Sequence, residues 1–159
     1  MYAKAFFDDL GFDSITTAPY MGKDSIEPFL AFENKHTILL ALTSNSGAFD
    51  FQTLESDSKP LYQSVLETSK TWNNSKNLMY VGEATKPEFF KAIGNIVTDH
   101  FLLVPGVGPQ GGSLDAVCKF GLHSNIGLLV NSSRGIIYAR STKDFAQHAS
   151  RRHKAFTHQ

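Results

Sequence analysis

Five short apolar runs along the chain predict five β-strands. Each run is rich in β-branched or aromatic residues, and several are apolar throughout instead of alternating with polar positions. The runs are Ser14–Ala18, Thr37–Thr43, Leu78–Gly82, Phe101–Val104 and Ile126–Val130. Because uninterrupted apolar runs are typical of strands buried on both faces, we expect a parallel sheet that is covered by helices.

Segments with helical signals lie before, between and after these runs. The first segment places Ala5, Phe6 and Leu10 near helical spacing. Ser25 is the predicted N-cap of the second, and Pro60 stands at the predicted first helical position of the third. The predicted helices are Met1–Leu10, Ser25–Asn34, Pro60–Asn73, Lys86–Ile96, Ser113–Phe120 and Ser141–Phe156. One helix followed by five βα units indicates an α/β fold with parallel strands.

The number of strands limits the architecture. Five parallel strands cannot close an eight-stranded barrel, which usually needs about 200 residues or more. The chain is therefore expected to form either an open sheet or part of a larger barrel. We predict loops at Glu55–Lys59 and Asn73–Asn77, and one domain over residues 1–159 that ends in a helix and basic tail over residues 141–159.

Composition and charge exclude several classes of protein. The 159 residues include 15 basic and 15 acidic side chains, so no global field attracts nucleic acid or an anionic membrane. No run of apolar residues is long enough to span a membrane. The single cysteine, Cys118, which we place on a helix, excludes a disulfide within the chain. We expect a cytoplasmic protein with no nucleic-acid partner, no membrane partner and no metal site.

A glycine-rich stretch, "VPGVGPQGG", follows the fourth apolar run directly. Gly106, Gly108 and Gly111 form the G-x-G-x-x-G pattern of dinucleotide-binding loops. That function also needs an acidic residue about 20 residues further on, and none stands in residues 131–135 after the next strand. Pro109 removes one of the backbone N–H donors that would hold a pyrophosphate. Both features argue against a nicotinamide or flavin site.

The last two predicted strand ends together indicate a phosphate site instead. In (β/α)₈ enzymes the loops after the last two strands commonly hold a phosphate at the start of a short extra helix. The first loop supplies glycine amides and Gln110, and the second supplies Arg134 and the Gly135 N–H. Residues 135–139 could form the short helix. The alternative is that Arg134 is a surface arginine and that the glycines only turn the chain.

Five segments resemble the orotidine 5′-phosphate decarboxylase family, in particular its longer bacterial subgroup. They occur in the family's order and cover nearly the whole chain: "YAKAFFDDLGFDSITTAPYMGKDSIEPFL", "ALTSNSGAFDFQ", "LMYVGEATKPE", "FLLVPGVGPQGG" and "GLLVNSSRGIIYA". The resemblance implies a (β/α)₈ barrel of which this chain supplies about strands 4 to 8. It also implies a homodimer that converts orotidine 5′-monophosphate to UMP and carbon dioxide without metal or organic cofactor.

The resemblance assigns two sets of binding residues. The set implied for the substrate phosphate is Gln110, Arg134, Gly135 and Gly108. The set implied for the pyrimidine is Ser44, Asn45, Pro105 and Val107. Ser44 resembles the serine that hydrogen-bonds the amide edge of the base, and Asn45 is a weaker candidate beside it.

One departure from the family concerns the chemistry itself. Family catalysis depends on an Asp-x-Lys-x-x-Asp stretch whose lysine delivers a proton to C6 of the pyrimidine, and no such stretch occurs in this chain. We expect it upstream of Met1, because the first helix resembles the one that follows that motif. Asp8 and Asp9 are no substitute, because no lysine stands at the right offset.

Three functions follow from this departure. The first is a fragment or truncated form of the decarboxylase, which we expect to be inactive alone. Its two unpaired strand edges, near Ser14 and Ile126, should also promote association. The second is a non-catalytic nucleotide- or phosphate-binding remnant. The third is another phosphate-handling barrel enzyme that shares the last two loops.

Overall fold

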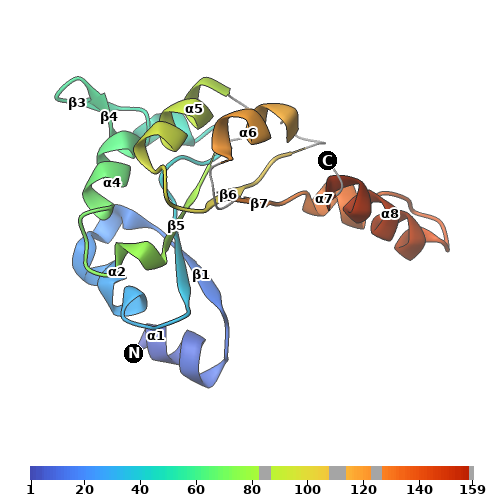
Figure 1. Ribbon diagram of the computed structural model, residues 1–159, viewed down its shortest axis with the longest axis horizontal. Helices are drawn as coiled ribbons and strands as arrows, with labels where there is room; N and C mark the ends of the chain where they lie inside the picture. The colour runs from blue at the N-terminus through green and yellow to red at the C-terminus, as the bar shows by residue number, and fades with distance from the viewer. Residues whose placement is uncertain (83–86, 108–113, 123–126, 158–159) are drawn as a thin grey trace.

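A five-stranded parallel sheet forms the centre of the computed structural model, which describes residues 1–82, 87–107, 114–122 and 127–157 (Figure 1). Its strands lie in the order β1-β2-β5-β6-β7. Their bounds are β1 Ser14–Thr17, β2 His36–Leu39, β5 Leu78–Val81, β6 Leu102–Val104 and β7 Leu128–Val130. The predicted strands and their parallel direction are confirmed, and β1 and β7 form the two edges of the sheet.

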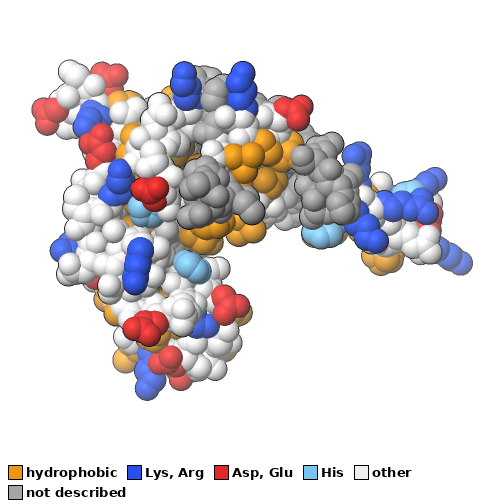
Figure 2. All heavy atoms as spheres, in the orientation of Figure 1, with side chains coloured by type: hydrophobic (Ala, Val, Ile, Leu, Met, Phe, Trp, Pro, Cys, Tyr) orange, Lys and Arg blue, Asp and Glu red, His pale blue; other side chains and the backbone are white. Residues whose placement is uncertain are grey.

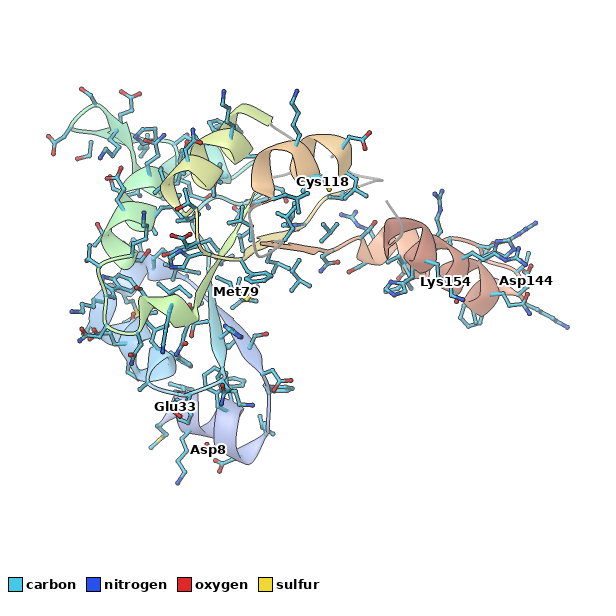
Figure 3. The ribbon with its side chains drawn as sticks, in the orientation of Figure 1. Asp8, Glu33, Met79, Cys118, Asp144 and Lys154 are labelled. Carbon is cyan, nitrogen blue, oxygen red and sulfur yellow. The ribbon has the colours of Figure 1, made fainter. Side chains whose placement is uncertain are left out.

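Helices connect these strands, and a small antiparallel hairpin is inserted between β2 and β5. The helical elements are α1 Tyr2–Lys4, η1 Ala5–Asp9, η2 Pro19–Met21, α2 Lys23–Leu30, α3 Ala48–Phe51, α4 Leu61–Ser69, η3 Ser75–Asn77, α5 Pro87–Ile96, α6 Leu114–Gly121, α7 Ser133–Ile137 and α8 Phe145–Thr157. The hairpin pairs β3 Glu55–Ser56 with β4 Lys59–Pro60. Cys118 lies on α6, as predicted (Figure 3). None of the helices in the described ranges is long and apolar enough to cross a membrane.

The helices α7 and α8 project away from the sheet, as Figure 1 shows. Basic side chains gather on this projection (Figure 2), and Arg151, Arg152 and Lys154 are all exposed on α8. The predicted helix at Ser141–Phe156 begins later, at Phe145, and that side chain is 55% exposed. The basic run is therefore solvated.

The main core lies between the sheet and α2, α4, α5 and α6. Alternate strand residues such as Leu39, Tyr80 and Val104 point into this core, and each is fully buried. On the opposite face, Ile38 and Met79 belong to a second, smaller apolar cluster. Apolar side chains thus occupy both faces of the central strands, which explains why their sequences do not alternate with polar residues.

The phenol of Tyr80 on β5 is fully buried in the core. Tyr80 Oη lies 2.9 Å from Ser69 Oγ, and Ser69 Oγ donates to the carbonyl of Leu66 at 3.1 Å. The ring of His100 packs edge-on against Tyr80, with centroids 5.3 Å apart. Burial raises the pKa of Tyr80 from its ordinary value of 10.0 to about 12, although the Ser69 hydrogen bond acts in the opposite direction.

This raised pKa predicts a loss of stability at high pH. The folded state favours the neutral phenol. The stabilisation that the neutral Tyr80 gives the folded state is therefore fully present below pH 10 and is lost as the pH rises toward 12. We expect the free energy of unfolding to fall over this window in the wild-type chain and to fall less in Tyr80→Phe. Urea unfolding at several pH values measures this free energy. Tyr138→Phe is the control, because Tyr138 is 77% exposed. Equal slopes in all three proteins would contradict the prediction.

The first helix differs from its predicted form. After α1 the chain forms a π-helix, in which the Leu10 N–H donates to the Ala5 carbonyl. The wider turn rotates the buried face, so Ala3 and Phe7 are buried, Ala5 and Phe6 are partly buried and Leu10 is 62% exposed. The predicted apolar face of Ala5, Phe6 and Leu10 is therefore wrong.

Two predicted helix starts are also wrong. Helix α2 begins at Lys23 after Gly22, and Ser25 Oγ donates back to the Gly22 carbonyl at 2.7 Å instead of capping the helix. Pro60 lies in β4, one residue before α4 begins. The predicted loop at Glu55–Lys59 is most of the hairpin, and Asp57 and Ser58 turn it with φ values of 53° and 61°.

Candidate functional site

A pocket of about 240 Å³ lies at the carboxyl ends of β6 and β7. Its lining residues are Pro105, Gly106, Val107, Asn131, Ser132, Ser133, Arg134 and Gly135. Gly106 has a φ of 86°, a conformation that glycine adopts without strain, so the chain can turn sharply at the end of β6. The pocket thus joins the start of the glycine loop to the loop after the last strand.

Two hydrogen bonds tie these two loops together, one of them buried. Ser132 Oγ, on a residue that is 7% exposed, donates to the carbonyl of Val107 at 2.9 Å. One residue earlier, the Asn131 N–H donates to the carbonyl of Val104 at 2.9 Å. One bond ends on the last residue of β6 and the other on the loop after it, so both fix the loop after β7 relative to the β6 side of the pocket.

Asn131 supports the first residue of the short helix that carries Arg134. Its Oδ1 accepts hydrogen bonds from the Ser133 N–H at 3.1 Å and from Ser133 Oγ at 2.7 Å. Helix α7 then runs over Ser133–Ile137, two residues earlier than the predicted range of 135–139. Arg134 and Gly135 consequently lie in its first turn. The Arg134 side chain is exposed and forms no ion pair with any described residue.

A second group of polar residues follows β2. Strand β2 ends at Leu39, earlier than the predicted run to Thr43, and the chain continues into an exposed loop that carries Ser44 and Asn45. Thr43 and Gln52 brace this loop through paired backbone and side-chain hydrogen bonds. Ser44 and Asn45 do not line the pocket between β6 and β7.

The residues assigned by the sequence thus fall into three groups. Four of them, Pro105, Val107, Arg134 and Gly135, surround one pocket. Ser44 and Asn45 lie on a different loop, after a strand of the same parallel sheet. Gly108 and Gln110 lie outside the described residues.

Three residues that support the site were not predicted from the sequence. Asn131 and Ser132 connect the pocket loops, and Gln52 holds the loop of Ser44 and Asn45. One signal was available for the first pair, because short polar side chains directly after a strand commonly start a helix. Within the described ranges, no three His, Cys, Asp or Glu residues lie close enough together to hold a metal ion.

Comparison with known proteins identifies the family. The model of the orotidine 5′-phosphate decarboxylase / HUMPS family matches residues 1–149. The chain belongs to this family. An orotidine 5′-phosphate decarboxylase of Flavobacterium johnsoniae is 70% identical over 149 residues, which are 94% of this chain and 55% of that protein. The chain spans about half the length of the curated relatives it matches.

Solved structures of orotidine 5′-phosphate decarboxylases and related proteins share the fold. Leishmania donovani UMP synthase superposes with a TM-score of 0.85 at 35% identity, covering 98% of this chain and 35% of that one. Leishmania donovani OMP decarboxylase gives 0.84 at 32% identity, covering 98% and 60%. The predicted family and the α/β fold of a (β/α)₈ barrel are therefore confirmed, with the five parallel strands forming part of the barrel wall.

Proposed function

We propose that this chain binds a pyrimidine nucleotide by its 5′-phosphate and supplies part of the active site of an orotidine 5′-phosphate decarboxylase. The reaction is the conversion of orotidine 5′-monophosphate to UMP and carbon dioxide. The observation that carries the proposal is the pocket in which residues 105–107, at the start of the glycine loop, meet Arg134 and Gly135. Family membership and the names of the relatives support it.

In this proposal the phosphate lies against the first turn of α7. The planar Arg134 guanidinium donates two parallel hydrogen bonds to phosphate oxygens, an arrangement that its exposed side chain permits, since it has no ion-pair partner in the described part of the chain. The Gly135 N–H is a second donor from the same turn. Gly108 and Gln110 complete the phosphate site from the glycine loop.

The pyrimidine lies between the two loops. Ser44 and Asn45 offer hydroxyl and amide groups, which can hydrogen-bond both the N–H and the carbonyl of the base. Pro105 and Val107 supply the apolar side of the base site. In this proposal the start of α7 binds the phosphate of the nucleotide, and the loop after β2 binds its base.

The proton for C6 must come from residues that this chain does not contain. No Asp-x-Lys-x-x-Asp stretch occurs in the sequence, so the chain offers no lysine in the position that the family uses. We propose that a separate segment supplies the motif, and that the complete enzyme is a cytoplasmic homodimer.

The experiment is decarboxylation of orotidine 5′-monophosphate by the purified chain, alone and after mixing with the part of the Flavobacterium johnsoniae relative that the chain does not match. We expect no turnover alone and turnover after mixing. Turnover by the chain alone would refute the assignment of the proton donor to another segment. Binding of UMP without turnover in the mixture would favour the non-catalytic alternative, which the missing motif also supports.

A further inference from the structure

Gln52 connects the loop after β2 to the elements that follow it. Its Oε1 accepts the Thr43 N–H at 2.8 Å, and its Nε2 donates to Thr43 Oγ1 at 3.0 Å. Thr43 Oγ1 donates in turn to Asn45 Oδ1 at 2.6 Å. These bonds form one continuous path from Gln52 to Asn45.

Two acceptors compete for the Thr43 hydroxyl proton, Asn45 Oδ1 at 2.6 Å and Gln52 Oε1 at 3.3 Å, and we assign the proton to the shorter contact. The Thr43 hydroxyl has one proton, and the short contact with Asn45 Oδ1 uses it. The hydroxyl oxygen can then accept the proton that Gln52 Nε2 offers. Asn45 Oδ1 is thereby held toward Thr43, and Asn45 Nδ2 lies on the other side of the amide, 3.1 Å from where a Cβ on Gly47 would lie.

Gln52 itself is anchored in the body of the protein. Its N–H donates to the carbonyl of Ala48 at 2.8 Å, and its carbonyl accepts the Tyr62 N–H at 2.9 Å. Ala48 is 3% exposed, and Tyr62 is 2% exposed and belongs to the main core. These hydrogen bonds therefore fix the position of the exposed loop relative to the core.

This arrangement leaves two groups of the loop available to a ligand. Ser44 and Asn45 are exposed, and neither Ser44 Oγ nor Asn45 Nδ2 hydrogen-bonds to another described residue. Asn45 Oδ1, by contrast, is occupied by Thr43. The brace thus decides which face of the Asn45 amide a ligand meets, and it presents a hydrogen-bond donor.

We propose that Gln52 is a positioning residue for recognition of the pyrimidine base, and that it acts through Thr43 by presenting Asn45 as a donor beside Ser44. The inference rests on the proposed function, because it takes the base to lie at this loop. It predicts that Gln52 governs affinity for the base and has no effect on the phosphate.

Two substitutions at Gln52 test its two side-chain hydrogen bonds to Thr43 separately. Gln52→Leu removes both side-chain bonds to Thr43. Gln52→Glu keeps an acceptor for the Thr43 N–H, but its carboxylate has no Nε2 donor and attracts the Thr43 hydroxyl proton away from Asn45. Gln63→Leu is the matched control, because Gln63 hydrogen-bonds to Tyr62 Oη on α4 and not to this loop.

The measurements are amide hydrogen exchange at Thr43 and calorimetric affinities for UMP and for ribose 5-phosphate, which shares the phosphate and lacks the base. We expect faster Thr43 exchange in Gln52→Leu and near wild-type exchange in Gln52→Glu. Both variants should bind UMP about tenfold more weakly, the effect of losing roughly one net hydrogen bond, and ribose 5-phosphate within about twofold of wild type. Gln63→Leu should leave both affinities and the exchange unchanged.

Other outcomes would overturn the proposal. Wild-type UMP affinity in Gln52→Leu would show that the brace does not govern base recognition. Equal losses for UMP and ribose 5-phosphate would indicate a general disturbance of the fold. A wild-type chain that binds neither ligand would contradict the proposed function, and unchanged Thr43 exchange in Gln52→Leu would still refute the brace independently.

Discussion

Replacing Arg134 by alanine is expected to lower the affinity of the chain for UMP about a hundredfold. Two charge-assisted hydrogen bonds contribute about 3 kcal/mol together at the lower end of their usual range, which corresponds to this factor. The Arg134 guanidinium is exposed at the rim of the pocket and has no ion-pair partner among the described residues, so no internal pair is broken by the change. Calorimetric titration with UMP measures the effect.

The charge and the fork geometry of Arg134 can be tested separately. Arg134→Lys should bind UMP more tightly than Arg134→Ala and more weakly than the wild-type chain, because an ammonium supplies the charge but not two parallel donors. Arg151→Ala removes an exposed arginine of α8 that does not line the pocket, and it is expected to leave the affinity unchanged. Uridine, which has no phosphate, should bind equally to all variants. A hundredfold loss for uridine as well would refute phosphate recognition by Arg134.

Much of the fold could be predicted because the sheet is buried on both faces. Residues in β2 and β5 face helices on one side and the smaller apolar cluster on the other, so their apolar runs indicate strands directly. The same signal overestimated β2, since Ala41 and Leu42 are buried in the loop after it. Buried positions carry apolar residues both in strands and in packed loops, so an apolar run does not show where a strand ends.

The short elements could not be predicted from local patterns. Helix α3 has four residues, and each strand of the β3–β4 hairpin has two. Backbone bonds between distant positions hold them, such as those from the Tyr62 N–H to the Gln52 carbonyl and from the Leu61 N–H to the Leu54 carbonyl. A pattern of hydrophobic and polar positions carries no information about such contacts.

The same limit applies to the candidate site. The meeting of Arg134 with the start of the glycine loop could be predicted, because each follows an apolar run of the same parallel sheet. Gln52 lies eight residues after Ser44, within a short polar and aromatic stretch that has no clear period. Its role depends on the turn between them, which brings its amide to the Thr43 backbone at 2.8 Å.

A second large effect is expected in the core, where Phe90→Ala should destabilise the chain by about 3–5 kcal/mol. Phe90 is 1% exposed and packs between β5, β6 and α6. A Cβ on Gly82 would lie 2.7 Å from Phe90 Cε2, and a Cβ on Gly121 would lie 2.5 Å from Phe90 Cε1. The ring therefore fills a slot between two glycines, and its removal leaves a cavity there. Urea unfolding followed by the fluorescence of Trp72, the single tryptophan, measures the loss. Phe145→Ala, at a 55% exposed phenylalanine, is the matched control and should cost less than about 1 kcal/mol.

The slot also predicts that Phe90 and Gly121 are energetically coupled. Gly121→Ala in the wild-type chain forces its new methyl group against the Phe90 ring and against Leu128 Cδ2, 2.7 Å away, at an expected cost of about 1–3 kcal/mol. In the Phe90→Ala background the ring is absent, so the methyl group enters vacated space and only the Leu128 contact remains. The double variant should therefore be more stable than the sum of the two single losses by about 1 kcal/mol or more. Strict additivity would mean that the cost of Gly121→Ala comes from the contact with Leu128 instead of from the Phe90 ring.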